Sequence, residues 1–160
     1  MIRFKSIAEQ RLDAAFANVQ EVIKRKGNGL SDDKLKFIPS ARKNKDASPE
    51  YLEVQKTYHQ YVKSFAMLVL NSGLVAALLY AQGKANKKEA YGLIIDHVTA
   101  WLNKQGHAKT SGKDAIKELY AKKGYQIRPA TLEAIRFLED LKRVADARLY
   151  KPAEKTKNNG

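Results

Sequence analysis

Apolar residues recur at intervals of three and four along most of this chain, which is the spacing of one face of an α-helix. The first such run follows a capping pattern, Ser6 with Glu9 three residues later. A basic cluster at 24–26 and the glycines Gly27 and Gly29 end it. No stretch alternates with period two over a useful length, so the pattern predicts an all-α fold. The apolar face of this first helix holds Leu12, Ala15, Phe16, Val19, Val22 and Ile23.

A second helix is predicted from Ser48, because a proline and an acidic residue follow in the first turn. Its face continues into a run of twenty residues, 64–83, that contains no charge. Asn71, Ser72 and Gly73 interrupt this run. Glycine weakens a helix interior, so Gly73 indicates a kink, a helix junction or a close helix crossing. We expect one helix to end near Leu70 and another to pass through 74–81 and end near Gly83. The apolar face before the junction holds Tyr51, Val54, Gln55, Tyr58, Tyr61, Val62 and Phe65.

The uncharged run is long enough to span a bilayer, and Lys63 and Lys84 flank it as membrane anchors would. The polar interruption falls near its middle, where a span tolerates such groups least. The other predicted helices are amphipathic, and each needs a partner for its apolar stripe. A helix that is apolar on all sides suits the centre of a bundle. We therefore expect the run to form a central helix pair that is hidden among its neighbours.

Three further helices complete the pattern. A capping box from Asn86 to Glu89 opens the first, and the second starts at 111–114, carries Ile116, Leu119 and Tyr120, and is closed by Gly124. The last opens at Arg128 and Pro129. We predict a compact single domain of about five to seven helices over residues 1–150, with a long loop at 30–47 that holds one helical turn at 31–36, and a flexible basic tail at 151–160. The apolar stripes of the first and last of these helices are Tyr91, Ile94, Ile95, Val98, Trp101 and Leu102, and Leu132, Ile135, Leu138, Leu141, Val144 and Leu149.

Charge points to a polyanionic partner. Lysine and arginine number 30 against 17 acidic residues, which gives a net charge of +13. Such an excess attracts nucleic acid first and anionic lipid second, although it also serves simply as a solvated, self-repelling surface. The chain contains no cysteine, and its three histidines, His59, His97 and His107, lack a recognisable metal-binding spacing. Without a nucleotide-binding or nucleophile motif, we predict no enzyme activity, no cofactor and no metal.

Candidate phosphate-binding residues lie on the last helix and at Lys63 and Lys84, which flank the uncharged run. On the last helix Arg136 and Arg143 are seven residues apart and share a face, but Glu139 is close enough to neutralise part of that cluster, so both interpretations stay open. No sequence-reading motif is present, so contacts would be made to backbone phosphates. Of the eight tyrosines, those on apolar faces are predicted to be core rather than base-stacking residues. The RNA-binding candidates are Lys63, Lys84, Arg136, Lys142, Arg143 and Arg148.

Four segments taken together resemble a known family: RLDAAFANVQEVIKR, VKSFAMLVLNSGLVAALLYAQGK, YGLIIDHVTAWLNK and TLEAIRFLEDLKRVADARL. In their order and spacing they are similar to the small subunit of the Cmr complex, the type III-B CRISPR RNA-guided effector (RAMP module). The resemblance implies a cytoplasmic antiviral-defence protein without its own catalytic site. Its implied partners are the large and backbone subunits, copies of itself in a filament, and guide and target RNA, with no membrane. The small subunit of the Csm-type complex is also helical and basic, and physical reasoning separates the two poorly.

Two other classes remain open. One is a nonspecific nucleic-acid-binding architectural protein, which would share the charge and the helical pattern. The other is a membrane-tethered basic adaptor, which would use the uncharged run as its anchor.

Overall fold

The computed structural model describes residues 4–24 and 49–149, and the side chains of all of these except 49–52. These ranges form six α-helices and no strand, which confirms the all-α prediction and the expected number of helices. The glycines after the first helix, the cap at Ser48, the loop at 30–47 with its turn at 31–36, and the tail at 151–160 lie outside the described residues. The helices are α1 Ile7–Lys24, α3 Pro49–Ser72, α4 Leu74–Ala85, α5 Glu89–Lys104, α6 Gly112–Tyr120 and α7 Gly124–Arg148.

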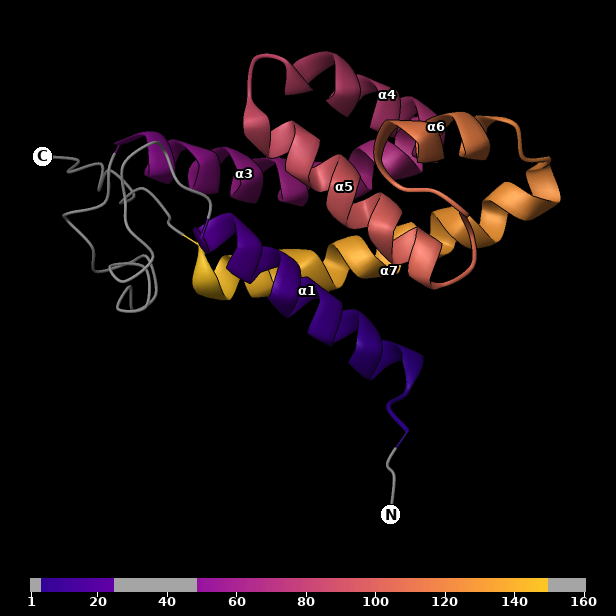
Figure 1. Cartoon of the computed structure of the whole chain (residues 1–160), viewed down its shortest axis with the longest axis horizontal. Coiled ribbons are helices and arrows are strands. Elements are labelled where there is room, and N and C mark those ends of the chain that lie inside the picture. Colours follow the sequence, from indigo (N-terminus) through magenta and orange to yellow (C-terminus); the bar gives the residue numbers. More distant parts are fainter. Residues whose placement is uncertain (1–3, 25–48, 150–160) are drawn as a thin grey trace, which may run out of the picture.

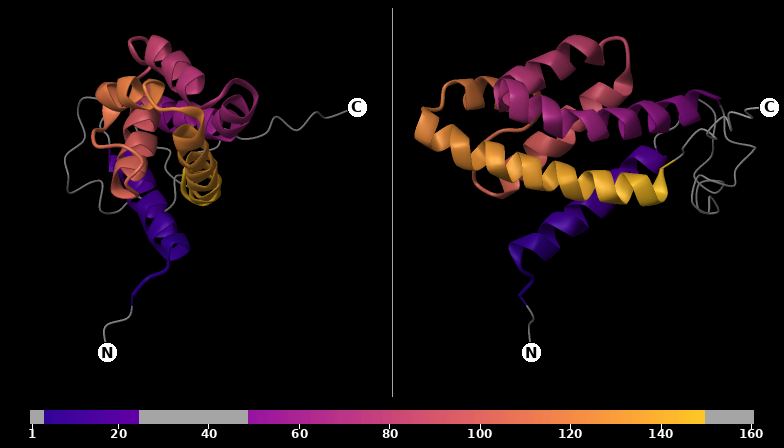
Figure 2. Two further views of the ribbon diagram at one scale, coloured as in Figure 1. Left: turned by 90° about the vertical axis from the view of Figure 1, so that its right-hand side faces the viewer. Right: turned by 180° about the vertical axis from the view of Figure 1, so that it is seen from behind.

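Helix α5 lies at the centre of the bundle and packs against each of the other five helices. In Figure 1 it runs between α4 and α6 on one side and α1 and α7 on the other. Seen from behind in Figure 2, α3 lies beside α7, and α1 crosses α7 at an angle. Because α5 is surrounded, almost its whole apolar stripe is buried, and only Tyr91 stays partly exposed.

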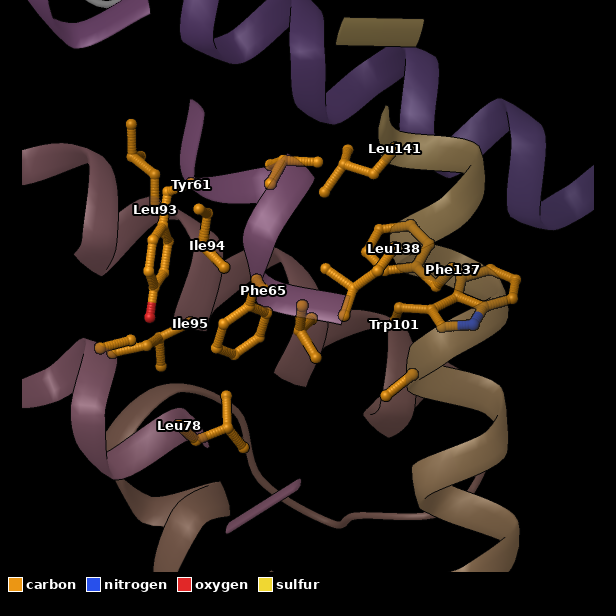
Figure 3. Packing of buried hydrophobic residues seen from close by; sticks show 14 of the residues in the cluster. Tyr61, Phe65, Leu78, Leu93, Ile94, Ile95, Trp101, Phe137, Leu138 and Leu141 are labelled. Atoms are coloured by element: carbon orange, nitrogen blue, oxygen red, sulfur yellow. The ribbon is translucent and has the colours of Figure 1, made fainter. Parts of the chain in front are cut away.

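The core draws apolar side chains from every helix. Phe65 of α3, Leu78 of α4, Ile94 of α5 and Leu138 of α7 converge in Figure 3. Trp101 stacks on the ring of Phe137 with 5.6 Å between ring centroids. Burying side chains of this size contributes about 1.5–3 kcal/mol each, so these contacts supply most of the favourable free energy of folding.

A single residue joins α3 to α4. Gly73 has φ +86° and ψ 160°, a backbone conformation that is almost restricted to glycine. The chain reverses there, so that the rings of Tyr61 and Tyr80 stack across the two helices at 6.4 Å. The predicted junction is confirmed. The alternative of a close helix crossing does not hold, because a β-carbon added to Gly73 would meet no atom within 4 Å. Glycine is required here by backbone geometry.

The uncharged run is buried on one side only. Leu74, Leu78 and Ala81 point into the core, whereas Asn71, Ser72 and Gly73 are exposed. The expectation that the run is hidden among its neighbours is therefore wrong for its outer face, because the neighbouring helices cover only its inner side. Large apolar residues that remain about half exposed there are Met67, Leu70, Leu79 and Tyr80.

No helix within 4–24 and 49–149 combines the length and apolar character that crossing a bilayer requires.

Helix boundaries were predicted correctly where the capping side chain had no competitor. Ser6 and Glu9 exchange the two hydrogen bonds of a capping box, with Ser6 N donating to Glu9 Oε2 at 2.8 Å and Glu9 N donating to Ser6 Oγ at 3.2 Å. The capping box predicted from Asn86 to Glu89 is wrong. Helix α4 ends two residues beyond Gly83, and Asn86 caps its C-terminus. Helix α5 begins at Glu89, with Lys88 as its N-cap.

The last helix also begins one turn earlier than predicted. Gly124 opens α7 instead of closing α6, because the side chain of Gln126 accepts a hydrogen bond from the N–H of Lys123 at 3.1 Å. Pro129 therefore lies inside the helix and removes one backbone hydrogen bond. Leu132 on α7 is more than half exposed, so it is not part of the buried stripe that was predicted for this helix, and Tyr120 at the end of α6 is also exposed.

The junction predicts a contrast between two glycines of the same helical hairpin. Gly73→Ala should lower the free energy of unfolding by about 1–3 kcal/mol, because alanine is strained at a positive φ. Gly83→Ala, inside α4 and facing open space, should leave stability unchanged or raise it by up to about 1 kcal/mol. Urea denaturation measures both. Equal effects of the two substitutions would contradict the conclusion that backbone geometry requires glycine at position 73.

Candidate nucleic-acid interface

A buried carboxylate ties three helices together beneath the basic face of α7. Glu133 of α7 accepts hydrogen bonds from Arg11 of α1, through Nε at 2.8 Å and Nη2 at 3.2 Å, and from Trp101 Nε1 of α5 at 2.9 Å. Burial would raise the pKa of this carboxyl group. The hydrogen bonds from Arg11 and Trp101, with the positive charges of Arg11 and Arg136, outweigh burial and lower the pKa below its ordinary value. Glu133 is therefore ionised at neutral pH and its charge is compensated from inside.

Two of the histidines are buried and hydrogen-bonded to residues distant in sequence. His97 Nδ1 lies 2.7 Å from Tyr58 Oη, and its Nε2 lies 3.1 Å from Glu21 Oε2, so α1, α3 and α5 are linked. Burial first, and the negative charge of Glu21 second, raise the pKa of the Tyr58 phenol. His59 Nε2 lies 2.5 Å from Asp146 Oδ1 and links α3 to α7. The sequence did not predict the carboxylate partners of these two histidines.

In the described part of the chain, no three histidine, aspartate or glutamate side chains are grouped so that they could hold a metal ion.

The six predicted RNA-binding residues do not form one cluster. Arg136, Lys142, Arg143 and Arg148 lie on α7, and Lys63 of α3 approaches that helix through Asp146, 3.6 Å from its Nζ. Lys84 lies on α4, which packs on α3, α5 and α6. Its Nζ sits over the ring of Tyr80 at 5.3 Å. The structure thus brings five of the six to the α7 side of the bundle and leaves Lys84 apart.

Local partners already occupy several of these cations. Arg143 Nη1 lies 2.8 Å from Asp140 Oδ1, so the expected intrahelical pairing exists, but with Asp140 in place of Glu139. The guanidinium of Arg148 lies over the ring of Phe16 at 5.2 Å. Arg136 is largely exposed, and its nearest carboxylate oxygen, on Glu133, is 4.0 Å away. Lys142 is exposed and makes no ion pair with a described residue.

A groove follows the first three turns of α7. It has a volume of about 680 Å³ and lies between α7 and the connection from α5 to α6, which contributes His107. Tyr125, Arg128 and Arg136 lie along it, none of them buried. The sequence interpretation treated Arg128 only as a helix start and did not single out Tyr125. Their spacing of three residues, with Leu132 and Arg136 following at four and four, was the signal that could have found this face.

The chain matches a known protein family and a solved structure. A model of the family described as CRISPR-associated protein (Cas_Cmr5) matches residues 40–148, more than half of the chain. The chain belongs to the Cas_Cmr5 family. The fold is also similar to the X-ray crystal structure of a CRISPR-associated Cmr5 family protein from Thermus thermophilus, with a TM-score of 0.61 and 16% sequence identity over 91% of this chain and 100% of that chain. At that identity the likeness shows the fold.

Membership in Cas_Cmr5 confirms the resemblance drawn from the four sequence segments. The family implies a small subunit of a type III-B CRISPR (Cmr) complex, associated with the other Cmr subunits. Proteins of this kind are generally non-catalytic structural components.

Two tyrosines one turn apart on α3 provide a matched test of the buried network. Tyr58→Phe leaves His97 without its hydroxyl partner and should lower the free energy of unfolding by about 1–3 kcal/mol. The buried hydroxyl of Tyr61 has no hydrogen-bond partner among the described residues, so Tyr61→Phe should be neutral or slightly stabilising. Thermal and urea unfolding would show this difference. Equal losses from both variants would mean that the His97 contact contributes nothing.

The Glu133 contacts predict a pH-dependent contribution to stability. Glu133→Gln should lower the free energy of unfolding by about 2–4 kcal/mol at pH 7, because Arg11 loses a buried charged partner. The exposed neighbour Glu139→Gln is the control and should change stability little. Because the folded-state pKa of Glu133 is lowered, its contribution is fully present above the unfolded-state pKa of about 4.3. It is lost as pH falls through the folded value. The difference in free energy of unfolding between wild type and Glu133→Gln, measured by urea titration, should therefore shrink as the pH falls through the folded-state pKa of Glu133. A difference that stays constant with pH would contradict the stabilising role of the ionised Glu133.

Proposed function

We propose that this Cas_Cmr5 protein is the non-catalytic small subunit of a cytoplasmic Cmr effector in antiviral defence. It stacks with copies of itself into a filament beside the large and backbone subunits. It contacts target RNA, or the duplex of guide and target, through backbone phosphates. The observation that carries the proposal is family membership, combined with a line of exposed basic residues along α7.

The cations on α7 suit a weak, sequence-independent contact. Arg136 and Lys142 are exposed and have no acidic group closer than 4.0 Å among the described residues. The pairs formed by Lys63 and Arg143 are solvent-exposed and contribute little, so phosphates can replace their carboxylates at small cost. Guide RNA would supply sequence specificity by base pairing, and the subunit would neutralise the backbone. Each contact adds modestly to the affinity for RNA, and an assembly of several subunits raises the overall affinity through effective concentration.

The outer face of α3 and α4 supports the proposed contacts with other subunits. Met67, Leu70, Leu79 and Tyr80 expose large apolar side chains on these two helices, and exposed apolar surface suits contact with another protein. A hollow of about 580 Å³ between α4 and α6, lined in part by Leu79 and Tyr120, adjoins it. If this face contacts a different face of the next copy, the association is head-to-tail and extends into a filament.

A nonspecific nucleic-acid-binding architectural protein is the second candidate, and the net charge of +13 favours it. Co-purification from the native host separates the two. A short guide RNA and larger Cmr proteins should accompany the tagged chain. Recovery of the chain with duplex DNA in their place would favour the second candidate.

The proposed backbone contacts predict a specific salt dependence. Replacing Arg136 and Lys142 together with alanine should reduce the slope of log K against log salt for single-stranded RNA by about 1.4, since each phosphate contact contributes about 0.7. Lys87→Ala, in the turn between α4 and α5 and away from α7, should leave the slope unchanged. Fluorescence anisotropy over a salt series measures both. An unchanged slope in the double variant would remove these two residues from the interface.

A further inference from the structure

We propose that the groove at the start of α7 binds single-stranded RNA by stacking one base on Tyr125, while Arg128 and Arg136 hold phosphates farther along the same strand. This inference rests on the proposed function for the identity of the ligand. It adds a binding site outside the six residues predicted from sequence, apart from Arg136. It also assigns that site to an unpaired strand and not to a duplex.

The charge in the groove is available to a ligand. Arg128 makes no ion pair with any described residue. Glu133 is the one acidic side chain among the residues that line the groove within the described part of the chain, and Arg11 and Trp101 occupy its oxygens from the core side. Arg136 is left with a single 4.0 Å approach to it. The groove is therefore positive although a glutamate forms part of its wall.

The far end of α7 is different. There Arg143 is paired with Asp140 and Arg148 covers Phe16, while Lys63 shares Asp146 with His59. Apart from Lys142, the cations of α7 that are not engaged in this way are Arg128 and Arg136, in the first half of the helix. Lys123, exposed in the turn just before α7, extends this positive charge beyond Tyr125.

The spacing of the side chains suits a strand that runs along the helix. Tyr125, Arg128, Leu132 and Arg136 follow one another at three, four and four residues, so they lie one above another on one face. The two arginines are about 12 Å apart along the helix axis. Leu132, 56% exposed, lies between them, and the ring of Tyr125, 72% exposed, stands at the end of the groove. An open aromatic ring beside a basic track is the arrangement that holds single strands.

The opposite wall is fixed in place by hydrogen bonds. The N–H of His107 donates to the carbonyl of Leu102 at 2.9 Å. Glu118 of α6 accepts from the N–H groups of Lys109 and Thr110 at 2.7 and 3.1 Å. The connection between α5 and α6 is therefore anchored at both ends, and the groove exists before any ligand enters.

A single strand fits these features better than the other candidates. Bases in a duplex are already stacked on one another, so the exposed ring and Leu132 would gain nothing from it. An acidic peptide would satisfy the arginines, but its charges follow no fixed repeat. A nucleic-acid strand carries a phosphate at every unit and so can engage Lys123, Arg128 and Arg136 in succession while presenting a flat base to Tyr125.

The test compares a fluorescein-labelled oligouridine with an abasic strand that has the same number of phosphates, using the full chain and fluorescence anisotropy. Wild-type protein should bind oligouridine about tenfold more tightly. Tyr125→Ala should abolish this preference and Tyr125→Phe should keep it. Tyr120→Ala, an equally exposed tyrosine on α6 outside the groove, should also keep it. Arg128→Ala should weaken both probes alike. All three positions are exposed, and melting curves verify folding.

Three results would overturn the inference. If wild type binds both strands equally while retaining salt-dependent affinity for RNA, base stacking is wrong and the proposed function stands. If polyglutamate displaces oligouridine at matched salt and Tyr125→Ala weakens polyglutamate binding, the groove is a protein-docking site. If this chain fails to cross-link to RNA within the purified Cmr assembly, the proposed function itself fails, whatever the abasic comparison shows.

Discussion

The contact among Glu133, Arg11 and Trp101 sets both the packing of the bundle and the charge of its surface. It joins the first helix, the central helix and the last helix at one carboxylate. A buried charge that loses its partner is costly, so α1 is held on α7 by more than apolar contact. Because the carboxylate is satisfied from the interior, it does little to cancel the cations outside it. The anchoring of α7 through Glu133 therefore leaves the positive charge on its outer face largely uncompensated.

Sequence periodicity was sufficient to define the helices because each must bury one side. The stripe of α5 and the Ser6–Glu9 capping box could be read directly, since nothing nearby competed with them. Boundaries failed where two local solutions were available. A proline preceded by arginine is a good helix start, but Gln126 caps Lys123 earlier and the helix accepts Pro129 in its interior. Hydrophobicity also could not reveal which side of the uncharged run lacked a neighbour.

The candidate site was less predictable from the sequence, because ion pairs between distant residues decide which cations stay available to a ligand. Composition identified the basic residues of α7, yet Arg11 and Glu133 are 122 residues apart, and His59 and Asp146 are 87 apart. No local pattern reports such pairings. Tyr125 and Arg128 were overlooked for a related reason: with the helix start placed at Arg128, the tyrosine fell outside the helix and its shared face with Arg136 disappeared.

The uncharged run, which is divided at Gly73, contains buried positions that pack in the core and exposed positions that do not. The inward positions Leu74 and Leu78 are fixed by the core, whereas Met67 and Leu70 before the joint, and Leu79 after it, are more than half exposed. Substitutions at these outward positions can reshape the exposed surface without disturbing the helical hairpin. A subunit built in this way can be refitted to neighbours of different shape while its own folding stays the same.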